Sequence, residues 1–332
     1  MILAIESSCD ETAAAIIIDG QIISNECITQ IKRHSKYGGV VPELASRLHA
    51  ECIDTVIDIA LKNAKASFKD IDHIAVTVGP GLEGSLLVGV VAANMLASQL
   101  KCPVIPVNHL HGHIYSAMAD YSYECPMLAC IASGGHTMLV YLKDSLSFEI
   151  VANTMDDACG ECFDKVARML GLNYPGGPFI EKAALEGNIN INLPHPVKHD
   201  SDKFSFSGLK TAVFDLVKRY ETVPVHDISA SFQDHVGQIL LHKIQQSLDQ
   251  YSCKQLLLCG GVFSNKHIRK VLMDNVSGVD VIIPELSLCT DNAAMIGLAA
   301  TQYLKSFKEL PTFVDVQTRL GLKLPKELCN GV

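Results

Sequence analysis

Two stretches far apart in the chain share one pattern, and this repetition constrains the fold more than any other feature. Each stretch is a short apolar run, a turn of small or polar residues, and a second apolar run. The first spans Ile2–Ile18 with its turn at Glu6–Thr12, and the second spans Met127–Tyr141 with its turn at Ser133–His136. Apolar runs bounded by turn residues predict strands. We therefore expect an internal duplication, with two similar α/β halves. Each half has a turn whose N–H groups can hold phosphate, although most such turns only reverse the chain.

The rest of the sequence alternates between predicted strands and helices, as expected for an α/β protein. Strands are predicted at 21–24, 74–78, 102–107, 256–259 and 281–283, and helices at 43–63, 160–170, 206–220, 227–250 and 293–304, with a further helix ending at 100. Glycine-rich turns at 79–84 and 260–261 precede helices and are suited to anions or to a flat ring. The spacing of the first turn fits neither a P-loop nor a dinucleotide fingerprint.

Composition and charge exclude several classes of protein. The chain has 332 residues, of which 48% are hydrophobic, enough for one large or two medium globular domains. Glu6 and Asp10 interrupt the first apolar run, so we expect no signal peptide, and we see no uninterrupted apolar run long enough to cross a bilayer. We accordingly expect no membrane association. The formal charge of −9 argues against non-specific coating of nucleic acid and leaves only local basic clusters. These clusters are 32–34, 218–219 and 266–270.

The cysteines point to a reducing compartment. Twelve are present, and only Cys159 and Cys162 form a Cys-x-x-Cys pair. Without a signal peptide a disulfide framework is not expected, so we place the protein in the cytoplasm. The pair could be redox-active or half of a zinc site, but no second pair completes four thiolates. We interpret it as two semi-apolar residues at the start of a helix.

A histidine-rich stretch follows the predicted strand at 102–107. Asn108 is a suitable N-cap, so a helix is predicted from His109, with His109 and His113 on one face and His111 on the opposite one. Two imidazoles on one helical turn can bind a transition metal, although surface or capping histidines have the same spacing. Gly112 is costly inside a helix and suggests close approach by a ligand or another backbone. The zinc-protease motif His-Glu-x-x-His is absent.

Another acidic candidate lies near the end of the sequence. Asp291 precedes the apolar helix predicted at 293–304, where it could simply be the N-cap or a first-turn acid.

Nine motifs, taken in order, carry a resemblance to one family: Glu6-Ser-Ser-Cys-Asp-Glu-Thr, Gly38-Gly-Val-Val-Pro-Glu-Leu-Ala-Ser-Arg47, Gly79-Pro-Gly-Leu, Asn108-His-Leu-His-Gly-His113, Ser133-Gly-Gly-His-Thr, Gly160-Glu-Cys-Phe-Asp-Lys-Val-Ala, Tyr174-Pro-Gly-Gly, Gly260-Gly-Val and Thr290-Asp-Asn-Ala-Ala-Met-Ile-Gly. Together they resemble the tRNA threonylcarbamoyltransferases of the TsaD type, formerly named O-sialoglycoprotein endopeptidases. The resemblance implies a duplicated actin/Hsp70/sugar-kinase-like α/β fold with two lobes and a central cleft. The expected lobes are 1–107 plus 293–325, and 108–292.

The resemblance also implies a ligand set. It implies one divalent metal ion, iron in preference to zinc, held by His109, His113 and Asp291. It implies a site for threonylcarbamoyl-adenylate or another adenine nucleotide, lined by Ile131, Ala132, Ser133, Gly134, Gly135, Asp164, Gly177 and Asn265. Archaeal relatives have a tyrosine metal ligand where Ile131 stands, which favours a bacterial or organellar type here.

The implied reaction is acyl transfer. The threonylcarbamoyl group moves from its adenylate to N6 of the adenosine 3′ of the anticodon in tRNAs reading ANN codons. Glu11 is the nearest acidic residue that could assist, although a surface glutamate is the commoner interpretation. The implied partners are tRNA, a threonylcarbamoyl-AMP synthase and, in bacteria, a paralogous TsaB-like subunit and a TsaE-like ATPase. A mitochondrial relative would instead be expected to form a homodimer.

Three alternatives remain open at this point. A small-molecule kinase of the same fold would not need the histidine pair. A metalloprotease is suggested by the old family name, but the general base of His-Glu-x-x-His is missing. A non-catalytic scaffold subunit would have no use for three separated metal ligands.

Overall fold

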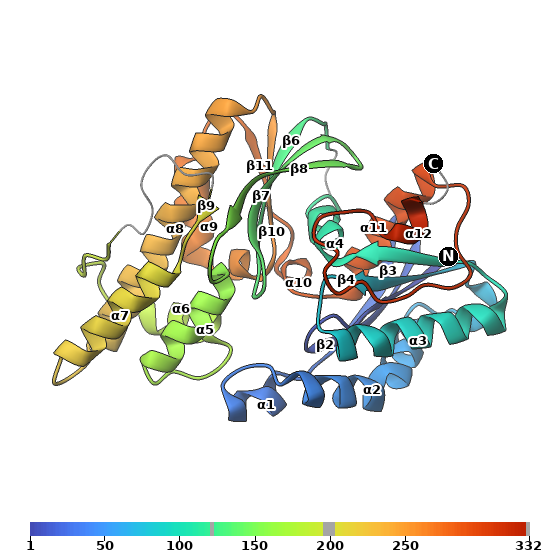
Figure 1. Ribbon diagram of the computed structural model, residues 1–332, viewed down its shortest axis with the longest axis horizontal. Helices are drawn as coiled ribbons and strands as arrows, with labels where there is room; N and C mark the ends of the chain where they lie inside the picture. The colour runs from blue at the N-terminus through green and yellow to red at the C-terminus, as the bar shows by residue number, and fades with distance from the viewer. Residues whose placement is uncertain (120–122, 195–202, 330–332) are drawn as a thin grey trace. The chain divides into compact units, whose positions relative to one another are not determined.

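The computed structural model describes residues 1–119, 123–194 and 203–329 (Figure 1). These form two compact units. The first comprises Met1–His34, Val40–Asp120 and Asp291–Val332, and the second comprises Ser35–Gly39 and Tyr121–Thr290. The units differ from the predicted lobes in two ways: residues 108–119 and 291–292 lie in the first unit, and residues 35–39 lie in the second. All three predicted metal ligands therefore belong to the first unit.

The first unit is built on a five-stranded sheet in the order β3-β2-β1-β4-β5. Its strands are β1 Ile2–Glu6, β2 Glu11–Ile18, β3 Gln21–Thr29, β4 His73–Gly79 and β5 Val104–Asn108, and its helices are α1 Ile31–His34, α2 Pro42–Asn63, η2 Phe68–Asp70, α3 Glu83–Leu100, α4 His109–Ser116, α11 Ala293–Ser306 and α12 Lys326–Cys329. β1 pairs with β2 in antiparallel fashion and with β4 in parallel fashion.

The second unit repeats this arrangement on a six-stranded sheet, β11-β10-β6-β7-β8-β9. Its strands are β6 Met127–Ala132, β7 Thr137–Asp144, β8 Ser147–Thr154, β9 Lys203–Phe204, β10 Gln255–Cys259 and β11 Asp280–Ile282, and its helices are η1 Ser35–Tyr37, α5 Cys159–Met169, α6 Gly176–Ala184, α7 Ser207–Arg219, α8 Val225–Gln250, η3 Gly261–Ser264, α9 Lys266–Asn275 and α10 Leu286–Cys289. Again the first strand, β6, is antiparallel to the next, β7, and parallel to the later β10. The expected duplication of an α/β unit is therefore confirmed.

Helix α11 is packed tightly onto the sheet of the first unit and onto α4. A Cβ added at Gly112 would lie 2.9 Å from Ile296 Cδ1 and 3.2 Å from Met295 Cγ, both on α11. A close approach does explain Gly112. The approaching groups are these two side chains and, at 3.6 Å, the backbone carbonyl carbon of Met295, so the expected close approach by another backbone is confirmed.

The segment after α11 returns along the sheet and is tied to the start of α4. Gln317 N donates to Val78 O at 2.6 Å, and Asn108 Nδ2 donates to Gly321 O at 2.8 Å and to Lys323 O at 2.7 Å. We call residues 307–325 the C-terminal strap (Figure 1). The strap holds the strand ends from which the histidine helix begins.

The apolar residues of α3 are interrupted by Asn94, so this helix is not an uninterrupted apolar run of the kind excluded from the sequence. Among the described residues, α3 is long and apolar enough to cross a membrane, with a mean hydropathy of 1.2 over 18 residues. One such helix is weak support for a membrane span, because core helices of globular units meet the same criterion. α3 packs against α2 and β4 and buries Leu86, Val90 and Ala93, whereas its large apolar side chains at positions 87, 91 and 95 are exposed.

The Cys-x-x-Cys pair lies at the start of α5, as interpreted from the sequence. Cys159 is the first residue of α5, and both Cys159 and Cys162 are fully buried. Burial raises the pKa of the Cys162 thiol to about 12. The pair therefore packs the core of the second unit and does not present a reactive thiolate.

Candidate functional site

Helix α4 brings the two predicted histidine ligands onto one face. Asn108 ends β5 and caps α4, because its Oδ1 accepts from Leu110 N at 2.8 Å. His109 Nε2 lies 3.6 Å and His113 Nε2 3.3 Å from the same oxygen, Oδ1 of Asp291. The predicted helix start and the shared face of His109 and His113 are confirmed.

His111 points elsewhere, as predicted. Its Nδ1 lies 2.6 Å from the Tyr303 hydroxyl, and complete burial lowers the pKa of His111 to about 3. A neutral His111 is thus part of the packing between α4 and α11, and only the other two histidines of the stretch face Asp291.

Asp291 is available as a ligand because its neighbour caps the helix. Asn292 is the N-cap of α11, and its Oδ1 accepts from Met295 N at 3.0 Å. The interpretation of Asp291 as an N-cap is therefore wrong. The Asp291 carboxylate instead faces the imidazoles of His109 and His113. All three side chains belong to the first unit.

The three side chains fit a divalent metal. Their ligand atoms lie within 4.8 Å of one another. Two atoms bound at 2.0–2.1 Å to a tetrahedral ion are about 3.3 Å apart, close to the two carboxylate–imidazole distances. Both ring nitrogens of His113 are buried and lack a hydrogen-bond partner among the described residues. Buried polar atoms are rarely left unsatisfied, and a metal at Nε2 would satisfy one of these two nitrogens.

Electrostatics around the cluster are dominated by carboxylates. Burial lowers the pKa of His109, but attraction to Asp291 and Glu6 outweighs burial and raises this pKa to about 9. Burial, reinforced by repulsion from Asp10 and Asp291, raises the pKa of Glu11 well above its ordinary value. Glu11 begins β2, is half-buried, and accepts from Thr29 Oγ1 at 3.3 Å. The first unit thus combines a site suited to a cation with a carboxyl group of increased basicity.

The second unit holds the predicted nucleotide-binding turn. β6 and β7 are joined by the turn at Ser133–His136, closed by Ser133 N donating to His136 O at 2.8 Å. A Cβ added at Gly134 or Gly135 would meet nothing within 4 Å, so this turn faces open space. Ile131 and Ala132 have fully buried side chains, and only their backbone can face a ligand.

The start of α5 supports this turn. Gly160 N donates to Ser133 O at 3.1 Å, and a Cβ at Gly160 would lie 2.8 Å from Gly134 Cα. One turn further along α5, Asp164 Oδ1 accepts from Gly176 N at 2.6 Å. Gly177 follows at the start of α6, where an added Cβ would again meet nothing within 4 Å. Four of the predicted residues, Ser133, Gly134, Asp164 and Gly177, are therefore linked through α5.

Asn265 has a structural role of its own. Its Oδ1 caps α9 by accepting from Ile268 N at 2.9 Å, and its Nδ2 donates to Gln233 Oε1 at 3.0 Å. The predicted contact of Asn265 with adenosine stays a prediction.

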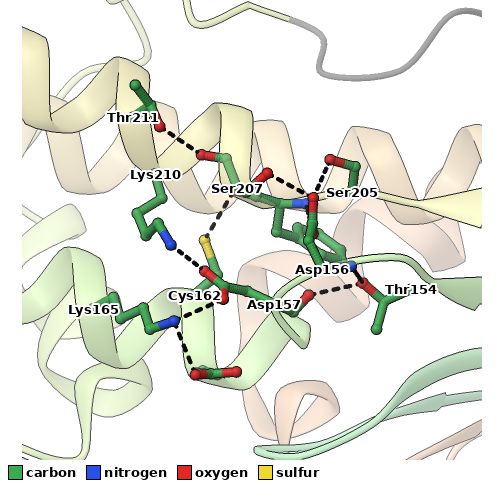
Figure 2. Close-up of polar contacts among 11 residues, drawn as sticks. Thr154, Asp156, Asp157, Cys162, Lys165, Ser205, Ser207, Lys210 and Thr211 are labelled. Atoms are coloured by element: carbon green, nitrogen blue, oxygen red, sulfur yellow. Dashed lines mark hydrogen bonds and ion pairs between the residues drawn. The ribbon is translucent and has the colours of Figure 1, made fainter.

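The loop before α5 is anchored by two aspartates, Asp156 and Asp157 (Figure 2). The sequence interpretation did not identify either of them. Asp156 accepts from Ser205 Oγ at 2.5 Å, Phe206 N at 2.8 Å and Ser207 Oγ at 2.6 Å. Asp157 pairs with Lys165 Nζ at 2.7 Å and Lys210 Nζ at 2.6 Å. We call these residues the Asp156–Asp157 cluster. The only signal in the sequence was the adjacent acidic pair, which gives no indication of such distant partners.

Comparison with known proteins decides the family. The sequence model of the family described as "TsaD: tRNA N6-adenosine threonylcarbamoyltransferase" matches residues 21–298. This chain belongs to that family. It is 49% identical over 307 residues to the tRNA N6-adenosine threonylcarbamoyltransferase of Staphylococcus aureus (strain JH9), covering 90% of each chain. The Bacillus licheniformis protein of the same name is 48% identical, covering 90% of this chain and 91% of its own.

The fold is shared with more distant structures. Component A of (R)-2-hydroxyglutaryl-CoA dehydratase from Acidaminococcus fermentans superposes with a TM-score of 0.56 at 14% identity, covering 92% of this chain and 99% of its own. This likeness confirms the predicted actin/Hsp70/sugar-kinase-like fold class and nothing more. As a member of the tRNA N6-adenosine threonylcarbamoyltransferase family the chain is a transferase of tRNA modification, and the kinase and scaffold alternatives are not favoured.

Proposed function

We propose that this chain transfers the threonylcarbamoyl group from threonylcarbamoyl-adenylate to N6 of the adenosine 3′ of the anticodon in tRNAs reading ANN codons. We further propose that His109, His113 and Asp291 hold a divalent metal for this reaction. The observation that carries the proposal is the convergence of these three side chains on one point, in a member of this family.

In the proposed reaction the N6 amine attacks the carbamoyl carbon. An N–C bond forms, the bond from that carbon to the phosphate oxygen breaks, and AMP leaves. When bound, the metal supplies Lewis-acid stabilisation of charge on the carbamoyl and phosphate oxygens. An exocyclic amine is a weak nucleophile, so holding the reactants in register contributes strongly to the rate.

Glu11 is the proposed acceptor of the proton that N6 loses. Its raised pKa makes the Glu11 carboxylate a stronger base than an ordinary glutamate. A base of this kind is most effective when its pKa approaches the working pH. The predicted consequence is that Glu11→Gln reduces kcat with a smaller change in KM.

We assign the adenylate to the turn of the second unit. Backbone N–H groups at Ser133, Gly134 and Gly135 suit phosphate oxygens, and the missing side chains leave room for a ligand to reach the backbone. Asp164 is proposed to contact the ribose, Gly177 to lie against the ligand and Asn265 to lie beside the adenosine. Ile131 and Ala132 would contribute backbone groups alone.

Iron is proposed as the metal in preference to zinc, because two histidines and one carboxylate also form the ligand set of non-haem iron(II) centres. The proposed setting is the cytoplasm, with tRNA as substrate and a threonylcarbamoyl-AMP synthase as the source of the adenylate. A TsaB-like subunit and a TsaE-like ATPase are the proposed partners if the source is bacterial, and a homodimer is proposed if it is mitochondrial.

The test is a reconstituted reaction. Unmodified tRNA reading an ANN codon is incubated with the protein, the partner proteins, threonine, bicarbonate and ATP, and its nucleosides are analysed by mass spectrometry. Threonylcarbamoyladenosine is expected only when the protein is present. Absence of this nucleoside, with a synthase shown to make the adenylate, would overturn the proposal.

A further inference from the structure

Glu6 is a charged side chain with no exposure to solvent. It is the last residue of β1, between two neighbouring strands, and its relative exposure is 0%. A carboxylate in such a place is strongly unfavourable unless it is hydrogen-bonded or paired. Retention of this charge at the end of a core strand therefore requires specific partners.

Glu6 has three partners, one on each neighbouring element. Ser8 N donates to Glu6 Oε1 at 2.5 Å, and Thr77 Oγ1 of β4 donates to Oε2 at 2.5 Å. His109 Nδ1 lies 3.2 Å from the same Oε2. β1 and β4 are paired in register up to Ile5 and Val76, so Glu6 and Thr77 are held by the sheet itself. The carboxylate is thereby fixed before any contact with His109 is counted.

The two nitrogens of His109 face opposite partners. Nδ1 faces Glu6, whereas Nε2 faces Asp291. An ionised carboxylate can only accept hydrogen bonds, so the Nδ1 that faces it carries the proton. In the neutral ring that metal binding requires, the lone pair then lies on Nε2, on the side of Asp291 and His113. Ser8 Oγ, also 3.2 Å from Nδ1, can either donate or accept and adapts to this tautomer.

We propose that Glu6 is a positioning residue for the metal centre, which fixes the tautomer and orientation of His109 so that Nε2 is the metal ligand. This inference rests on the proposed metal centre. The two ligating histidines then differ, because His113 has no comparable partner among the described residues, and both its ring nitrogens lack a hydrogen bond there. His109 is held at Nδ1 by a buried carboxylate, whereas Nδ1 of His113 has no hydrogen-bond partner among the described residues.

The decisive variant is Glu6→Gln in the full-length protein. Glutamine has nearly the same shape but offers an amide N–H₂ as well as an oxygen, so it no longer imposes one tautomer on His109. Loss of an outer carboxylate partner of a ligating histidine typically weakens metal binding about 10–100-fold. The expected result is a Co²⁺ or Zn²⁺ dissociation constant raised by about that factor, measured by competition with a chromophoric chelator.

Asp10→Asn is the matched control. Asp10 belongs to the same turn and also loses one negative charge, but its side chain does not touch the His109 ring among the described contacts. A positioning role predicts a much larger loss of metal affinity for Glu6→Gln than for Asp10→Asn. Equal losses would mean that Glu6 acts only through its charge, and that result would overturn the inference.

Thr77→Val provides a second variant in case Glu6→Gln does not fold, as judged by its thermal unfolding. Thr77→Val keeps the side-chain volume at position 77 and leaves the Glu6 carboxylate in place. It removes the hydroxyl that donates to this carboxylate. A several-fold weaker affinity for Co²⁺ and a changed intensity of the Co²⁺ d–d bands are expected. Wild-type affinity and spectrum in a folded Glu6→Gln or Thr77→Val protein would refute the role of Glu6. If the wild-type protein itself binds no Co²⁺ or Zn²⁺, the proposed metal centre fails instead.

Discussion

Replacing Asn108 with alanine would loosen the histidine helix and the C-terminal strap together. The Asn108 side chain is fully buried and makes three hydrogen bonds. Its Oδ1 caps α4 at Leu110 N, and its Nδ2 donates to the carbonyl oxygens of Gly321 and Lys323 on the strap. One substitution therefore removes the cap and leaves two carbonyl groups without this donor.

The size of the effect follows from these contacts. Loss of a side-chain N-cap costs about 1 kcal/mol, and each carbonyl that loses its donor costs about 1 kcal/mol more. The expected loss in the free energy of unfolding is about 3 kcal/mol, which corresponds to a melting temperature lower by about 6–12 °C in a domain of this size. Metal affinity should fall as well, because His109 is the first residue of α4.

Thermal unfolding and hydrogen exchange measured by mass spectrometry test this prediction. Faster exchange is expected in both the strap and α4. Asn94→Ala is the control, since Asn94 of α3 holds the strap at Val314 through two hydrogen bonds of 2.8 and 3.0 Å but does not contact α4. Asn94→Ala should speed hydrogen exchange in the strap and leave metal affinity unchanged. A loss below 1 kcal/mol for Asn108→Ala, or exchange confined to the strap, would contradict the reasoning.

Three further predictions concern other parts of the chain. Asp157→Asn in the Asp156–Asp157 cluster of Figure 2 should lower the free energy of unfolding by about 1–2 kcal/mol, because two lysines lose their shared carboxylate. An unchanged free energy of unfolding in denaturant would contradict this. Cys162 has a pKa of about 12, so about one thiol in 10,000 is ionised at pH 8, and iodoacetamide should alkylate it far more slowly in native than in urea-unfolded protein. Peptide mass spectrometry at pH 8 measures both alkylation rates, and equal rates would refute the burial of Cys162. Reversing the charge at Lys32 and Arg33 of α1 should weaken tRNA binding and flatten its salt dependence, and unchanged binding at low salt would exclude this patch.

Local patterns predicted most elements of this protein, although they missed strand β8. The start of α4 at His109 and its cap at Asn108 follow from short-range rules, because a cap acts on amides two or three residues away. The same holds for the strand–turn–strand units, whose hydrogen bonds join neighbours in sequence. Periodicity also placed His109 and His113 on one face.

Long-range partners could not be read from the sequence. Glu6 was interpreted as part of a polar turn, yet it ends a core strand and faces His109, 103 residues away. The residue that caps α11 is Asn292, so the short-range rule pointed to the wrong neighbour when it favoured Asp291 as the cap. The contact between Glu6 and His109 depends on how the sheet and helices pack, which no local pattern encodes. The cap at Asn292 is a local contact, but Asp and Asn are similarly good N-caps, so the rule does not choose between these neighbours.

The most direct test of the account compares metal-site variants in the tRNA reaction. Wild-type protein, the His109→Ala/His113→Ala double variant and a His226→Ala control, whose histidine side chain is 52% exposed, are each incubated with partner proteins, tRNA, threonine, bicarbonate and ATP. Nucleoside mass spectrometry should detect threonylcarbamoyladenosine with the wild type and the control, and none with the double variant. Equal amounts from all three proteins would keep the activity and contradict the metal centre, whereas no product from any of them, with active partners, would contradict the proposed function.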